Sequence, residues 1–149
     1  MIGLLQRVTE AAVHVDGTCV GRIGPGLVVL IGIERRDTRT QAERLLERLL
    51  GYRVFDNAEG RMEHSLRETA GALMLVPQFT LVADTRKGTR ASFTPAATPQ
   101  SGSALFGYLL HRARSEHGAV AAGRFGAHMQ VSLINDGPVT FWLQVPPAV

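Results

Sequence analysis

Cysteine is almost absent from this sequence: Cys19 is the only one among 149 residues. An intrachain disulfide is therefore excluded. The neighbours of Cys19 in GTCVGR include no histidine or carboxylate that could activate a thiol, so this cysteine is predicted to be buried or to lie on a strand rather than to act as a nucleophile. The five histidines are scattered without the spacing of a zinc site, so no metal and no other cofactor is predicted.

Long hydrophobic runs and targeting signals are missing too. No stretch approaches the roughly 20 continuous apolar residues that a membrane span needs, and MIGLLQRVTE lacks the features of a signal peptide. The protein is therefore predicted to be cytoplasmic and not membrane-bound. The nucleophile elbow GxSxG, the phosphate loop GxxxxGK and the zinc motif HExxH do not occur either. If the chain is an enzyme, it has no conspicuous side-chain nucleophile.

The composition is that of a folded globular domain. Hydrophobic residues make up 45% of the chain and charged residues 19%, and a chain of this length can bury roughly 70% of its unfolded surface. Residues 1–149 are therefore predicted to form one domain. The formal net charge is +3, and every cation except Lys87 is an arginine. This excess is compatible with an anionic partner such as RNA, but many ordinary enzymes share it.

The hydrophobic pattern predicts a mixed α/β layer domain. One helix is expected over Thr38–Leu50, with apolar residues on one stripe and a capping box at its start, and a second from Thr98 or Pro99 to about Glu116. The segments that fit strands are residues 2–9, 11–16, 18–23, 27–33, 52–55 and 72–83. Pro77 interrupts the last of these, so the residues around it are expected at a sheet edge, a bulge or a strand end. The chain is expected to end in a hairpin, in which AHMQVSLIND and VTFWLQV flank a turn at Gly137–Pro138.

Two segments are candidates for chemistry. In PQFTL, strand alternation would put Gln78 and Thr80 on one face and Phe79 on the other. The alternative for this segment is a half-exposed strand without a chemical role. In NDGPVT, Gly137 permits close approach of the backbone and Pro138 fixes φ, and the alternative is an ordinary tight turn. Pattern alone favours the structural alternative in both segments.

Four stretches together carry a family resemblance. MIGLLQRV, LLGYRVFDNAEGRM, VPQFTLVADT and GRFGAHMQVSLINDGPVTFWLQV resemble the bacterial D-aminoacyl-tRNA deacylases, in order and spacing, from Met1 to Val145. The resemblance implies mixed, largely antiparallel β-sheets with two main helices packed on one side. It implies a hydrolase that cleaves the ester between a D-amino acid and the 3′-terminal ribose of tRNA, as chiral proofreading in translation, and that also clears glycine mischarged on tRNA for alanine. It further implies a homodimer with active sites at the subunit interface.

The resemblance assigns a role to the Gly137–Pro138 segment. Its peptide would be cis, would insert into the site of the partner subunit, and would reject L-amino acids by main-chain contacts at the α-carbon. Arg7 would hold this segment by hydrogen bonds to its backbone. Trp142 is then interpreted as a core anchor for the following strand and not as a substrate contact.

The resemblance also implies which residues form the pocket. Gln78, Phe79 and Thr80 would line the site for the terminal adenosine and the ester, and backbone N–H groups near Phe79 and Thr80 would form an oxyanion hole. Phe125 and Met129 would belong to the pocket wall or to its interface side. Thr80 is the only hydroxyl in the motif and has no evident activating base. The alternative, which the missing triad favours, is assistance by the 2′-OH of the RNA.

Two further features qualify this assignment. The family motif usually begins with Ser where this chain has Pro77, which puts in doubt any role for a hydroxyl there and predicts looser discrimination against glycine or L-alanine. The loop RKGTR is either a solvated loop or a contact to the acceptor end of tRNA; its cations are Arg86, Lys87 and Arg90. The alternative function for the whole chain is a dimeric tRNA- or RNA-binding module without catalysis.

Overall fold

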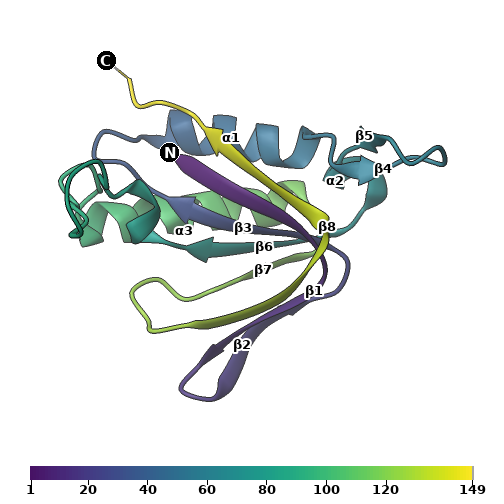
Figure 1. Ribbon diagram of the computed structural model, residues 1–149, viewed down its shortest axis with the longest axis horizontal. Helices are drawn as coiled ribbons and strands as arrows, with labels where there is room; N and C mark the ends of the chain where they lie inside the picture. The colour runs from purple at the N-terminus through teal and green to yellow at the C-terminus, as the bar shows by residue number, and fades with distance from the viewer. Residues whose placement is uncertain (149) are drawn as a thin grey trace.

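The computed structural model describes residues 1–148 and has a strongly curved sheet with two long helices, α1 and α3 (Figure 1). The strands are β1 (Ile2–Val15), β2 (Thr18–Ile23), β3 (Gly26–Gly32), β4 (Phe55–Asp56), β5 (Met62–His64), β6 (Ala72–Pro77), β7 (Val120–Ala122) and β8 (Gln130–Gln144). The helices are α1 (Arg39–Gly51), α2 (Leu66–Thr69), the 3-10 turn η1 (Phe79–Val82) and α3 (Pro99–Glu116). No helix within residues 1–148 is long and apolar enough to cross a membrane.

Strand β1 is paired along both of its edges. On one edge it pairs with β8 from end to end, antiparallel. On the other edge its first half pairs with β3 and its second half with β2, again antiparallel. β6 lies parallel to β3, and β7 lies parallel to β6. The sheet is therefore mixed and largely antiparallel, and this confirms the predicted fold class.

Both long helices begin where the sequence predicts. Thr38 caps α1 and forms the capping box with Gln41, and Thr98 caps α3 with a proline in its first turn. The apolar stripe of α1 is buried; its members are Ala42, Leu45, Leu46, Leu49 and Leu50. Burying a leucine side chain stabilises a fold by about 1.5–3 kcal/mol. This stripe packs against α3 and the sheet in one core cluster.

Alternation along the central strands divides the core in two. Val29 of β3 and Leu75 of β6 lie in the cluster that contains the helices. Their neighbours Val28 and Met74 lie in a second cluster with the residues of β2. The sheet curls around this second cluster, so that β2 also contacts β7. Gly21 allows this closure, because a Cβ there would stand 2.8 Å from the Ala122 carbonyl oxygen.

The expected C-terminal hairpin is wrong. β8 runs through Gly137–Pro138 without reversing, because both of its halves pair antiparallel with β1: Ala11 opposes Leu133, and Leu5 opposes Phe141. Asn135 pairs with Val8 and Thr140 with Gln6, so residues 136–139 bulge out opposite a single residue of β1. Proline has no N–H to donate to the ladder, which is why the segment leaves the sheet there.

Three other expectations also differ from the structure. The strand predicted over 72–83 stops at Pro77 and turns into η1, so the alternation of Gln78 and Thr80 on one strand face does not occur. Trp142 does not anchor the core, since 53% of it is exposed. Its neighbour Leu143 is the buried residue, because alternate side chains of β8 point to opposite faces. The strand predicted over 52–55 is reduced to β4, which begins only at Phe55.

Candidate active site

The corner after β6 exposes backbone and side-chain groups together. The Gln78 N–H donates to the Ile31 carbonyl oxygen at 2.8 Å, which fastens the corner to β3. The Gln78 side-chain amide donates to the Thr80 hydroxyl, so both polar groups of the motif face one another. Phe79 and Thr80 stand at the start of η1, where the first N–H groups of a helical turn have no internal acceptor. This corner can therefore offer N–H donors to an external oxygen.

An apolar trough lies beside this corner. Its cavity volume is about 510 Å³, and it is lined by residues from several segments that include Pro77, Phe79, Phe93 and Phe125. Phe79 is 60% exposed and Phe93 44% exposed, and their ring centroids are 5.1 Å apart. Exposed aromatic rings at the mouth of a cavity are suited to stacking on a planar ligand such as a base.

A second, smaller cavity of about 250 Å³ adjoins the trough and shares Pro77 and Phe79 with it. Gln78, His128 and Met129 also line it. The structure thus brings together five of the residues proposed for the pocket; they are Gln78, Phe79, Thr80, Phe125 and Met129. Pro77, the departure from the family pattern, lines both cavities.

The pocket wall is held by packing from α3 and by the loop after β7. The Phe125 and Phe106 rings lie 6.4 Å apart, and a Cβ on Gly102 would come within 3.1 Å of Phe125. The Met129 sulfur accepts a hydrogen bond from the Arg124 N–H at 3.3 Å. These contacts position Phe125 and Met129, although both residues lie in the loop between β7 and β8.

The Gly137–Pro138 bulge is held from below by Arg7. The Arg7 Nε donates to the Asp136 carbonyl oxygen at 3.0 Å, and its Nη1 donates to the buried Val54 carbonyl oxygen at 2.7 Å. On the other side of the bulge, the Val139 N–H donates to the Asn135 side-chain oxygen at 2.8 Å. The Gly137–Pro138 peptide is cis, as the resemblance implies, and Gly137 has φ +144°. Any side chain at Gly137 would meet Val139 at 2.6 Å.

Within one chain the bulge and the pocket are far apart. Arg7, opposite the bulge, pairs with Leu27 of β3, and Leu27 pairs with Leu73 of β6. Pro77 lies four residues further along β6, and β6 is three strand spacings from β8. Four residues of strand span about 13 Å and three strand spacings about 14 Å, so the separation is on the order of 20 Å. A single chain therefore does not bring Gly137–Pro138 to Gln78, Phe79 and Thr80.

The basic loop that follows η1 forms an open depression of about 560 Å³, lined by Asp84, Arg86, Lys87, Arg90 and Ser92. Arg86 makes two parallel hydrogen bonds to Asp84, with Nε–Oδ1 at 2.9 Å and Nη2–Oδ2 at 2.6 Å. The side-chain hydrogen bonds from Arg86, followed by the Arg86 N–H, lower the pKa of Asp84 to about 2. Asp84 is thus ionised at neutral pH and offsets the charge of Arg86. Lys87 and Arg90 have no ion-pair partner within residues 1–148.

Sequence reasoning missed two residues of the trough, Phe93 and Arg35. Phe93 lies in a long loop without periodicity, and Arg35 lies in the connection before α1. Each joins the site only through tertiary packing, so no local signal identifies them. Among residues 1–148, no group of three or more His, Cys, Asp or Glu side chains is arranged to hold a metal ion.

Comparison with known proteins assigns the chain to one family. The family model described as D-Tyr-tRNA(Tyr) deacylase matches residues 4–144. A D-aminoacyl-tRNA deacylase of Thioalkalivibrio sulfidiphilus is 67% identical, with 99% of each chain covered. A solved structure named c-Myc DNA Unwinding Element Binding Protein superimposes with a TM-score of 0.94 at 34% identity, covering 98% of this chain and 99% of the other.

A second solved structure, described as a probable eukaryotic D-amino acid tRNA deacylase, has a TM-score of 0.84 and covers 97% of this chain and 98% of its own. Its identity is 19%, so it supports the fold alone. The curated relative and the family model carry the assignment further, because both extend over nearly the whole sequence. The chain therefore belongs to the D-aminoacyl-tRNA deacylase family and is an enzyme that hydrolyses D-aminoacyl-tRNA.

Proposed function

We propose that the trough and the adjoining corner bind the 3′ end of D-aminoacyl-tRNA, with the terminal adenine stacked on Phe79 and Phe93. The observation that carries this proposal is the exposed aromatic pair beside unpartnered N–H groups at the start of η1. Base–aromatic stacking contributes about 1–3 kcal/mol per base. The N–H groups of Phe79 and Thr80 then face the ester carbonyl and stabilise the oxyanion that develops on it.

The nucleophile in this proposal is a water molecule assisted by the 2′-OH of the terminal ribose. Within residues 1–148 the only hydrogen-bond partner of the Thr80 hydroxyl is the Gln78 amide, which donates to it and cannot remove its proton. We expect Thr80→Val to lose less than ~10-fold in rate, and a 2′-deoxy substrate to be nearly inert. The reverse pattern, in which the Thr80→Val variant is inert and the wild-type enzyme still cleaves the 2′-deoxy substrate, would identify Thr80 as the nucleophile.

The chirality filter in this proposal is Gly137–Pro138 of a second copy of the chain. Rejection of every L-amino acid with acceptance of every D-amino acid requires contacts at the α-carbon alone, and backbone carbonyl groups can make them. Three observations support delivery from a second copy: the bulge projects from β8, it lies about 20 Å from its own pocket, and β8 presents exposed apolar side chains. These are Val131, Ile134 and Trp142.

Mixed dimers test this arrangement. A filter variant with Gly137 and Pro138 both replaced by alanine should hydrolyse L-Tyr-tRNA, because its pockets remain intact. A tenfold excess of a pocket variant, Phe79→Ala with Thr80→Val, places an intact filter against most of these pockets. If subunits assort freely, the rate at which the filter variant hydrolyses L-Tyr-tRNA should fall about tenfold. L-activity that does not change on mixing would contradict a filter supplied by the partner.

The substrate range is part of the same proposal. We propose chiral proofreading in the cytoplasm, where charged tRNA is used, and removal of glycine from tRNA for alanine, since glycine has no side chain for the filter to reject. Pro77 replaces the usual serine and lines both cavities, so Pro77→Ser is expected to slow glycine or L-alanine release relative to D-tyrosine release. The direct assay is ester release from D-Tyr-tRNA, L-Tyr-tRNA and Gly-tRNA for alanine. Equal rates on the D- and L-tyrosyl substrates would refute the filter.

The basic loop is proposed to contact the acceptor end of the tRNA through Lys87 and Arg90, with Arg86 partly offset by Asp84. Phe93 continues this loop into the trough, which supports a path from the loop to the terminal nucleotide. Family membership sets aside the alternative of an RNA-binding module without catalysis.

A further inference from the structure

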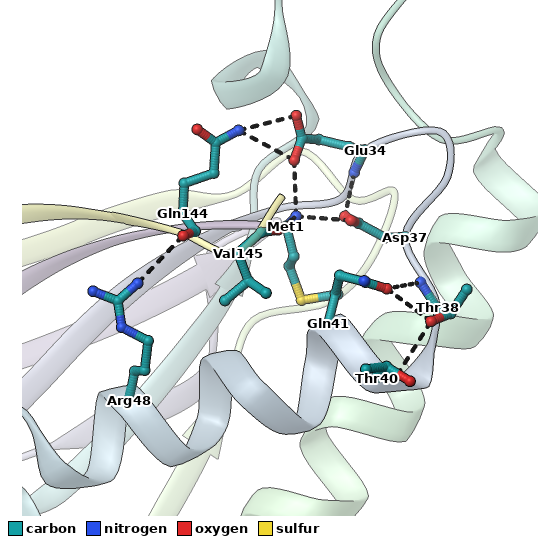
Figure 2. A network of polar contacts seen from close by, with 9 residues as sticks. All are labelled: Met1, Glu34, Asp37, Thr38, Thr40, Gln41, Arg48, Gln144 and Val145. Atoms are coloured by element: carbon teal, nitrogen blue, oxygen red, sulfur yellow. Dashed lines mark hydrogen bonds and ion pairs between the residues drawn. The ribbon is translucent and has the colours of Figure 1, made fainter. Parts of the chain in front are cut away.

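The connection between β3 and α1 carries two acidic residues that face inward. The Met1 ammonium donates to the Glu34 carboxylate at 2.8 Å, to the Asp37 carboxylate at 2.8 Å, and to the Val145 carbonyl oxygen at 2.7 Å (Figure 2). The second Asp37 oxygen accepts the Glu34 N–H at 2.7 Å. The side chains of Met1 and Asp37 are fully buried. The acids of this connection are therefore engaged inside the protein.

The arginines of the same connection face outward. Arg35 and Arg36 lie between the two clamped acids, and both are exposed. Arg39, at the start of α1, is exposed as well. None of the three has an ion-pair partner within residues 1–148. We call Arg35, Arg36 and Arg39 the arginine rim.

The arginine rim is fastened to the wall of the trough. The Arg35 N–H donates to the Pro95 carbonyl oxygen at 2.9 Å, and the Ala97 N–H donates to the Ile33 carbonyl oxygen at 3.0 Å. Arg35 lines the trough together with Phe79 and Phe93. It also lines a neighbouring cavity of about 250 Å³ that includes Arg39. Arg35 thus links the trough to the cavity beside Arg39 at the start of α1.

Packing also orients Arg39. Its guanidinium carbon stands 4.6 Å from the ring centroid of Tyr108, and the Tyr108 hydroxyl donates to the Glu43 carboxylate. No acidic residue occupies the first turn of α1, so no carboxylate within that turn neutralises the positive end of the helix dipole. The guanidinium group is thus held on an aromatic face with its N–H groups available to an anion.

We propose that the arginine rim binds phosphates of the tRNA acceptor end, immediately before the terminal nucleotide. This rests on the proposed function, in which the trough holds the terminal adenosine. The chain of nucleotides must then leave the trough across its rim, and Arg35 lies on that rim. Arginine forks match phosphate oxygens in geometry and charge. The rim would form a second phosphate-binding surface, built from a different part of the chain than Lys87 and Arg90.

The test compares a substrate that carries the rest of the tRNA with one that ends at the terminal adenosine and has no phosphate. One is D-Tyr-tRNA, and the other is 3′-O-D-tyrosyl-adenosine, which has none. The test variant changes Arg35, Arg36 and Arg39 to glutamine. The matched control changes three exposed arginines that line none of these cavities to glutamine: Arg44, Arg61 and Arg67. Both variants lose the same charge, so nonspecific attraction to tRNA falls equally.

We expect the rim variant to lose kcat/KM on D-Tyr-tRNA by about 10- to 100-fold at 50 mM salt, and the control variant by less than about 3-fold. The loss on tRNA should exceed the loss on the adenosine ester at least tenfold. The slope of log kcat/KM against log salt should become shallower by about two, since each phosphate contact contributes about 0.7–0.9.

Other outcomes overturn the inference. Equal losses on the two substrates, or equal losses in the rim and control variants, would refute phosphate binding by the rim while leaving the deacylase site intact. A wild-type protein that releases tyrosine from neither substrate would refute the proposed function itself, and the inference with it. Thermal unfolding of both variants verifies that each is folded, because the changes affect exposed side chains.

Discussion

Replacement of Arg7 by lysine tests how far the bulge depends on one side chain. Arg7 is 8% exposed and reaches carbonyl groups of two separate segments, Asp136 of the bulge and Val54 before β4. Lysine keeps the positive charge but cannot reproduce the planar fork that spans both oxygens. One charged hydrogen bond contributes about 1.5–3 kcal/mol, and a buried carbonyl left unpaired costs about 1–3 kcal/mol. We therefore expect Arg7→Lys to lower the free energy of unfolding by about 2–4 kcal/mol.

The same substitution should affect chirality more than turnover. A displacement of a positioning group by about 1 Å can cost on the order of 100-fold in a reaction, so we expect the D- to L-Tyr-tRNA rate ratio to fall by about that factor. Urea unfolding measures the stability, and ester release from the two substrates measures the ratio. Arg44→Lys, an exposed arginine paired with Glu47, is the control and should change neither. A variant destabilised as expected but with an unchanged rate ratio would refute the role of Arg7 in chiral selection.

Three other substitutions test separate parts of the structure. Asp37→Ala removes one of the two carboxylates that bind the buried Met1 ammonium, so it is expected to lower the free energy of unfolding by about 1.5–3 kcal/mol in urea. A loss below about 0.5 kcal/mol would contradict a stabilising role of this ion pair. Asp84→Asn removes the ion-pair partner of the Arg86 guanidinium, and we expect it to strengthen tRNA binding and to steepen the salt dependence of binding by about one unit of slope. Weaker binding of tRNA in a nitrocellulose-binding assay would count against a role of this loop. His128 is the only ionisable side chain that lines the smaller cavity, and His128→Gln is expected to lose less than about 10-fold in rate, since a general base contributes about 100- to 10,000-fold; a loss in that higher range would make His128 the base.

The groups proposed to act on the ester and the groups proposed to reject L-amino acids lie on different segments of the chain. The N–H groups and the aromatic rings of the pocket lie on η1 and on loops braced by β3 and α3. The proposed filter lies on a bulge that is tied to β1 by Arg7. Because the two lie on the order of 20 Å apart within one chain, chemistry and chiral selection would meet only when two copies associate. Dimerisation would then be a requirement for selectivity rather than an addition to it.

The sequence by itself determined the elements whose signals are local. The capping box of Thr38 with Gln41 and the Thr98–Pro99 start locate both helices, because a cap and a stripe of apolar residues lie within a few turns of each other. The end of β6 at Pro77 was also predictable, since proline cannot continue a ladder. The family resemblance pointed to the motifs and to the cis peptide at Gly137–Pro138.

Only the tertiary structure decided how these motifs lie in space. The same residues around Gly137–Pro138 suit a hairpin or a bulge, and the choice depends on both halves of β8 pairing with β1, more than 110 residues away in sequence. Trp142 and Leu143 are both large hydrophobic residues, and Leu143 is buried because it lies on the face of β8 that meets the helices. The trough joins Arg35, Phe79, Phe93 and Phe125 from four separate segments. Such groupings arise from packing between distant parts of the chain, so local sequence patterns do not predict them.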